Sequence, residues 1–186
     1  MNDNSIFRLK IQYKGENEEN GNIEKIKLEI LVQCVNYTDA ETVMCKIAEQ
    51  YQMDKYEPYT YDIVKTKFSA GDIYGGAVLS ADDANKSLTC GLLQHFFENE
   101  SDGLYAVETV VFETIDGKEK SRKETCYIPA TDVADAMGAA TAILRHRGES
   151  PDDFIIPSAK LDNATYIYLR PKTSEEIFNQ ANDIFN

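Results

Sequence analysis

The sequence predicts an α+β protein formed by tandem duplication of a β-β-α-β unit, with antiparallel sheets that carry one helix each. The first observation is a repeated motif, because Thr-Asp-Ala-Glu at 38–41 returns as Thr-Asp-Val-Ala at 131–134, an offset of 93 residues. The second is that two alternating apolar and polar runs precede each motif, and the third is that another strand-like run follows it. We therefore expect one compact domain of two pseudo-symmetric halves, each with three or four strands.

The first unit is predicted to span residues 1–74 and to begin with a hairpin. Apolar side chains alternate with polar ones over 7–14 and again over 26–32, which is the period of a half-buried strand. The segment 16–22 between them is polar and contains a glycine flanked by asparagines. This composition is typical of a hairpin loop, here a longer one than the two-residue kind.

A helix and a third strand complete the first unit. Thr38 is a favourable N-cap, and Glu41 stands three residues later, as a capping box requires. The apolar positions that follow share one helical stripe, which predicts a helix over about 39–52. The run 59–68 then predicts the third strand, and 73–74 a short fourth piece.

The second unit, 105–170, is predicted to repeat this order. Its hairpin turns at Asp116-Gly117, a strong signal for a tight turn. Its loop is about five residues shorter than the first, because Phe7 aligns with Tyr105 at an offset of 98. The remaining elements are strands over 105–115 and 120–128, a helix that begins at Thr131 or Asp132 and ends at about Arg147 before Gly148, and strands over 154–160 and 165–169.

The residues between the units, 75–104, form a connecting insert that we expect to be partly helical. Ser80 and Asp83 fit a helix cap, and the polar run 99–103 is typical of a linker. Four apolar residues recur on a common helical stripe after the cap, namely Ala84, Leu88, Leu92 and Phe96.

The last segment, 171–186, is predicted to be an amphipathic helix with no counterpart in the first unit. Thr173 and Glu176 form another capping box. Apolar residues follow at positions i, i+1, i+4, i+7 and i+8, which places them on one stripe. Two interpretations stay open, since the stripe can pack on the protein's own sheet or bind a partner protein. The candidate residues for a partner are Ile177, Phe178, Ile184 and Phe185, with Ala181 on the same stripe.

The order of strand, polar loop, strand, Thr-Asp helix start and Lys-Phe-Ser segment resembles DUF4494, a family of small uncharacterised proteins from Bacteroidetes and their phages. The resemblance covers nearly the whole chain, although the insert is longer than the family leads one to expect. It implies an intracellular protein of gut bacteria, a mobile element or a phage, and it supplies no catalytic residues. The segments that carry it are 9–13, 28–35, 38–41, 65–69, 105–114 and 131–136.

Composition excludes some classes of function. The formal net charge of −13 argues against a protein that coats polyanions generally, because such proteins present a basic surface. No apolar run approaches the roughly 20 residues that cross a bilayer, and residues 1–5 carry no secretory signal, so we expect no membrane contact. The cysteines are far apart, which favours reduced, buried thiols in a cytoplasmic protein, and the resemblance implies a bacterial host cell. These cysteines are Cys34, Cys45, Cys90 and Cys126.

The residue patterns predict no catalytic residue, no metal site and no cofactor. His146 lies between two arginines near a helix end, where positive charge interacts favourably with the helix dipole, and His95 fits a packing role. The acidic pairs 82–83 and 152–153 fit caps or loops, because adjacent side chains point in different directions. The chain contains no HExxH, phosphate-loop or nucleophile-elbow motif.

Basic and aromatic residues on the predicted strands suggest a surface for single-stranded nucleic acid, where charges follow phosphates and rings stack on bases. An alternative is that cross-strand Lys–Glu pairs stabilise the sheets and the tyrosines cover the core. The residues proposed for nucleic acid are Arg8, Lys10, Lys14, Lys25, Lys27, Lys120, Arg122, Tyr59, Tyr61, Tyr166 and Tyr168.

Three hypotheses follow for the function. The first is a non-enzymatic accessory protein of a phage or mobile element that binds single-stranded nucleic acid. The second is a protein-interaction module, either a homodimer or a binder of a host factor, supported by the acidic charge and the apolar stripe of 171–186. The third is an enzyme or small-molecule binder with a site between the two halves, for which the residues suggest no mechanism.

Overall fold

The computed structural model describes residues 5–74, 88–89, 92–95 and 103–170. The described residues divide into two compact units. The first unit contains 5–71, 88–89, 92–95 and 163–170, and the second contains 72–74 and 103–162. None of the helices in these segments is long and apolar enough to cross a membrane.

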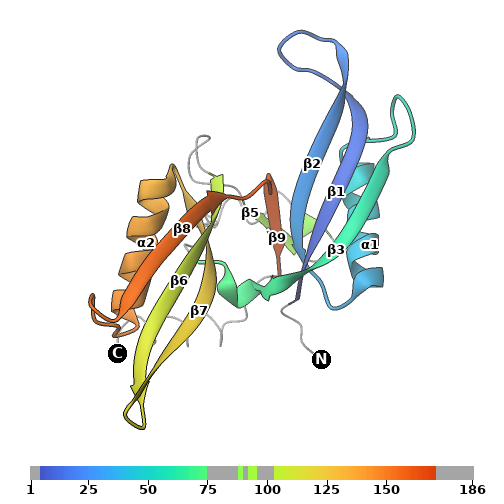
Figure 1. Cartoon of the computed structure of the whole chain (residues 1–186). Helices are drawn as coiled ribbons and strands as arrows, with labels where there is room; N and C mark the ends of the chain where they lie inside the picture. Colours follow the sequence, from blue (N-terminus) through green and yellow to red (C-terminus); the bar gives the residue numbers. More distant parts are fainter. Residues whose placement is uncertain (1–4, 75–87, 90–91, 96–102, 171–186) are drawn as a thin grey trace. The chain divides into compact units, whose positions relative to one another are not determined.

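A six-stranded sheet forms the first unit, and one helix lies along one face of its β3–β1–β2 part (Figure 1). Strands β1 and β2 form an antiparallel hairpin, and β3 pairs with the other side of β1. Alternate side chains of β1 and β2, such as Leu9 and Ile30, pack against the helix, which is why apolar residues of both strands alternate with polar ones. The elements are β1 (Ser5–Glu16), β2 (Ile23–Gln33), α1 (Tyr37–Gln50), β3 (Thr60–Ser69) and a 3-10 turn (Ala70–Asp72).

The second unit has the same element order around a three-stranded sheet, with the helix on one face (Figure 1). Its hairpin turns at Asp116 and Gly117, whose φ angles of 54° and 74° confirm the predicted two-residue turn. The predicted helix stop is confirmed as well, because Gly148 has a φ of 88°. The elements are β6 (Gly103–Ile115), β7 (Lys118–Ala130), α2 (Val133–His146) and β8 (Phe154–Leu161).

The helix caps correct the predicted alignment of the two units. The side chain of Asn36 caps α1 by accepting the N–H of Asp39, and Asp132 caps α2 by accepting the N–H of Asp135. Asn36 and Asp132 lie 96 residues apart, so the offset of 93 is wrong for the helices. The predicted Thr38 cap is also wrong, because that residue already lies in the first turn of α1. The two Thr-Asp motifs therefore occupy different places relative to their helices. Thr38 and Asp39 lie inside the first turn of α1, whereas Asp132 is the cap of α2 and Thr131 precedes it.

The buried positions agree with an offset of 96. Adding it to the buried residues of α1 gives positions that are buried or partly buried in α2, such as Ala40 with Ala136 and Met44 with Ala140. The strand registers also agree, since Leu9 lies opposite Ile63 in the first unit and Val107 lies opposite Ala159 in the second. The first strand of each hairpin keeps the predicted offset of 98, whereas the second strand has an offset of 96. The first hairpin is therefore two residues longer than the second.

The last described strand belongs to the first unit, although the sequence placed 165–169 in the second. Strand β9 (Tyr166–Leu169) runs parallel to β2, with Tyr166 opposite Ile30 and Tyr168 opposite Val32. Both tyrosines thereby join the apolar face that packs against α1. The boundary predicted at 74 shifts as well, because Ile73 bridges to Tyr127 in the second unit.

The described part of the insert consists of strands, so the predicted helix over Leu88 and Leu92 is wrong there. Strand β4 (Leu88–Thr89) pairs with β5 (Leu92–His95), which pairs with β9 and places Leu92 in the core. The predicted cap at Ser80 and Asp83, Ala84, Cys90, Phe96, most of the linker and the helix over 171–186 lie outside the described residues.

Candidate nucleic-acid interface

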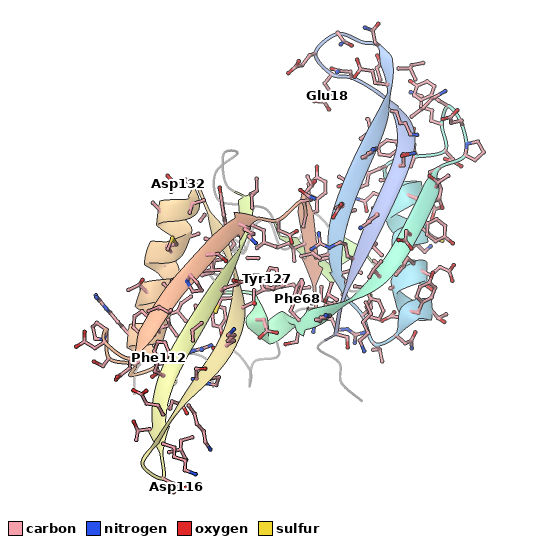
Figure 2. The ribbon with its side chains drawn as sticks, in the orientation of Figure 1. Glu18, Phe68, Phe112, Asp116, Tyr127 and Asp132 are labelled. Carbon is pink, nitrogen blue, oxygen red and sulfur yellow. The ribbon has the colours of Figure 1, made fainter. Side chains whose placement is uncertain are left out.

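Exposed lysines from both strands of the β1–β2 hairpin share the face of the first sheet that is opposite α1. Side chains alternate along a strand, so Lys10 and Lys14 lie on this face while their odd-numbered neighbours pack toward the helix. The register places Lys14 opposite Lys25 and Gln12 opposite Lys27. We call Lys10, Lys14, Lys25 and Lys27 the lysine face. It lies toward the hairpin loop, where Figure 2 labels Glu18.

Ion pairs occupy only part of this surface. Arg8 pairs with Glu29 at 2.8 Å, and Lys14 pairs with Glu57 at 2.9 Å. The other three lysines of the face form no ion pair within the described parts of the chain, and these are Lys10, Lys25 and Lys27. Positive charge is therefore available there for an anionic ligand.

The pairing of Lys14 with Lys25 is unfavourable for the fold itself. Like charges directly opposite each other on neighbouring strands destabilise a sheet. Lys10 is better placed, since it lies opposite Glu29 on β2 and Asp62 on β3. The repulsion is confined to the hairpin end of the face.

The opposite end of the same face is buried, which limits the extent of the lysine face. Ile6 and Leu31 have no exposed surface, and Gln33 is 8% exposed. The accessible part of the face is thus the half formed by the long, projecting hairpin.

The tyrosines lie on the other face of the sheet. Tyr166 and Tyr168 do share a face of β9, but it is the face that packs against α1, where Tyr168 is completely buried. Tyr59 packs against the same core, and the Tyr61 hydroxyl donates a hydrogen bond of 2.8 Å to Glu41 of α1. The structure therefore brings the five basic residues of the first hairpin together without the four tyrosines.

Burial and hydrogen bonding keep these tyrosines uncharged. Burial is the main cause that raises the pKa of Tyr59, Tyr166 and Tyr168. For Tyr61, the hydrogen bond to the Glu41 carboxylate raises the pKa to about 12. Tyr166 also stacks on Tyr51, with ring centroids 6.5 Å apart. These contacts support the alternative reading in which the tyrosines cover the core.

Of the two basic residues predicted for the interface on the second hairpin, Arg122 is neutralised by carboxylates. Arg122 forms ion pairs with Glu113 at 3.2 Å, with Glu149 at 3.3 Å and with Glu124. Lys120 lies opposite Glu113 in the register. The predicted contribution of Arg122 to a phosphate-binding surface would require it to leave these carboxylates.

A neighbouring contact fastens the end of α2. Arg147 pairs with Glu124 at 2.8 Å, lies over the Tyr74 ring at 5.2 Å and donates a hydrogen bond to the Tyr74 hydroxyl. Burial raises the pKa of the nearby Cys126 thiol and that of Tyr74. Sequence reasoning did not find this cluster, whose members come from three distant segments of the chain.

The remaining residues that the sequence singled out have local roles. His146 lies in the last turn of α2, and Asp153 lies in a turn where its carbonyl accepts the N–H of Phe112. Cys34 and Cys126 are buried as predicted, whereas Cys45 is exposed, contrary to the prediction. The described residues hold no group of three side chains suited to a metal ion.

The two units also differ on the face of the sheet that lies opposite the helix. At an offset of 98, Lys10 corresponds to Glu108 and Lys14 corresponds to Phe112. A basic surface in one unit thus stands where the other carries an acidic and an aromatic side chain. The sequence contains this difference between the units, but the positions can be compared only once the offset of each strand is known.

Comparisons with known proteins agree with the resemblance seen in the sequence. No curated protein and no solved structure matches the chain. A family model described as a domain of unknown function matches residues 5–169, which include both units. The chain therefore belongs to the DUF4494 family.

Proposed function

We propose that this protein is a non-enzymatic accessory protein that binds single-stranded nucleic acid through the lysine face. The observation that carries the proposal is the exposed lysine face, where Lys25 lies opposite Lys14 and where Lys10, Lys25 and Lys27 form no ion pair within the described residues. A fold gains nothing from opposed like charges. A phosphate backbone would relieve that repulsion and would release counterions.

The surface supports contact with phosphates rather than with bases. Lys10 and Lys14 lie four residues apart on one strand, a separation of roughly 13 Å, so they follow an extended chain. The tyrosines that could stack on bases lie on the helix-covered face. Binding should therefore be insensitive to base sequence and weak, because the rest of this chain of net charge −13 repels phosphates.

The family and the architecture suggest a setting for this role. We infer that the two units arose by tandem duplication, which is supported by their common strand order, helix length and buried positions. A duplicated unit is free to change on its uncovered face while the core is retained. A phage or mobile element acting in the bacterial cytoplasm is the context we propose for such a protein.

A salt titration with a fluorescent oligothymidylate tests the proposal. At low salt the protein should bind, and the slope of log K against log salt should be at most about 3, since single strands give about 0.7 per phosphate contact and the face has four lysines. The double variant K25E/K27E should weaken binding at least about tenfold and lower the slope by about 1.4.

A matched variant separates the lysine face from net charge. K118E/K123E makes the same change of charge on the second hairpin and should weaken binding much less. Duplex DNA of the same length is the second comparison, and tighter binding to the duplex would show that the lysine face does not select single strands. Absence of binding at low salt, or equal losses in the two variants, would show that the lysine face is not a nucleic-acid surface.

A further inference from the structure

Three apolar side chains lie close together on the face of the second sheet opposite α2, and two of them are exposed while Val110 is half-buried. Val110 lies opposite Ile155 in the register, and Phe112 follows two residues along β6 (labelled in Figure 2). Ile155 is 51% exposed and Phe112 is 40% exposed. We call Val110, Phe112 and Ile155 the apolar patch.

The fold does not require apolar residues at these positions. The corresponding positions of the first unit are Gln12, Lys14 and Thr60, which are polar, although β8 reaches Ile155 through a register shift that β3 lacks there. Single exposed apolar residues are ordinary, but adjacent ones that replace polar residues on a solvent face indicate a contact surface. The patch is independent of the lysine face and of the function proposed for it.

We propose that the apolar stripe of the segment 171–186 packs on the apolar patch. This stripe repeats at helical spacing and ends in Ile184 and Phe185. These are large apolar side chains, which can cover the apolar patch. Sixteen residues in a helix would extend about 24 Å, close to the roughly 20 Å that β6 covers from Ala106 to Phe112.

Charge favours this segment as the occupant. The segment carries one lysine and three acidic residues, which are Glu175, Glu176 and Asp183. Cations flank the patch, because Lys123 lies opposite Val110 and Lys160 lies opposite Ala106. Among the acids of this face, Glu108 already accepts a hydrogen bond from Ser158. An acidic amphipathic segment therefore fits the patch both by its stripe and by its charge.

A single tryptophan can report on the patch, because the chain contains none. In full-length F112W the indole should emit as a shielded side chain. Adding I177D/F178D to the stripe should shift the emission to longer wavelength and increase quenching by iodide. Adding N179D/Q180E introduces the same charge off the stripe and should leave both readouts unchanged.

Two further measurements complete the test. V64W places the reporter on an exposed position of the first unit, and its emission should respond to neither pair of substitutions. Circular dichroism should show that every variant is folded. A solvent-like emission of F112W in the natural tail would overturn the proposal. So would a shielded emission that depends on protein concentration, with a doubled mass in light scattering, because a second copy would then be the occupant.

Discussion

At the scale of single residues, Tyr61 shows how the fold gives a side chain a role that its sequence position did not suggest. It is 42% exposed, yet its hydroxyl donates to Glu41 and so connects β3 with α1. The hydrogen bond requires the protonated phenol, and the carboxylate repels the phenolate. Both effects raise the pKa of Tyr61 to about 12.

The direction of this shift predicts a dependence on pH. Since the folded pKa of Tyr61 lies above its ordinary value of 10.0, its contribution to stability is complete below pH 10 and is lost as the pH rises toward 12. The substitution E41Q should return the pKa of Tyr61 toward 10. Carbon-13 NMR of labelled tyrosine rings measures it, and Y61F assigns the signal. An unchanged titration in E41Q would contradict the hydrogen bond as the cause.

The candidate site was predictable only in part, because the pairing of separate strands decides which face of the sheet a side chain joins. Alternation within one strand placed Lys10 and Lys14 on a common face, and the hairpin pairing extended it to Lys25 and Lys27. Alternation does not say which face of the sheet a separate strand presents. Tyr166 and Tyr168 share a face as expected, but the parallel pairing with β2 turns that face toward α1. Which side chains of a strand face the core thus depends on its register with a distant segment.

At the scale of elements, local signals predicted which elements exist better than where they begin. Both hairpins and both helices were predicted, because they follow from periodicity and turn residues. The start of α1 was misplaced by two residues because Thr38 and Asn36 are both suitable caps. In the insert, the spacing of Leu88 and Leu92 fits a helix as well as it fits two short strands. Only the pairing of β5 with β9 decides for the strands.

Two substitutions distinguish the observed cap from the predicted one. N36A removes the side chain that accepts the N–H of Asp39 at 2.9 Å, and it should lower the free energy of unfolding by about 1 kcal/mol. T38A should change it by less than about 0.5 kcal/mol, because that side chain lies in the first turn and caps nothing. Urea denaturation measures both, and the reverse ranking would show that Thr38 rather than Asn36 caps α1.

At the scale of the whole molecule, the order of strands along the chain differs from their order in the first sheet. The first unit is completed by β9, which follows all the described residues of the second unit in sequence. Parallel pairing of β2 with β9 joins residues more than 130 positions apart, as in Val32 with Tyr168. No local pattern encodes such a contact, which explains why the sequence assigned 165–169 to the wrong unit.

This closure predicts that a substitution near the end of the chain weakens the strands near its beginning. Tyr168 is fully buried beside Val32, so Y168A should lower stability by about 3 kcal/mol or more. Hydrogen exchange should then accelerate at the amides of β2. L161A, at a side chain that is 61% exposed, is the control and should change stability by less than about 0.5 kcal/mol. If Y168A accelerated exchange in β6 and β7 while β2 stayed protected, β9 would not be the strand that completes the first unit.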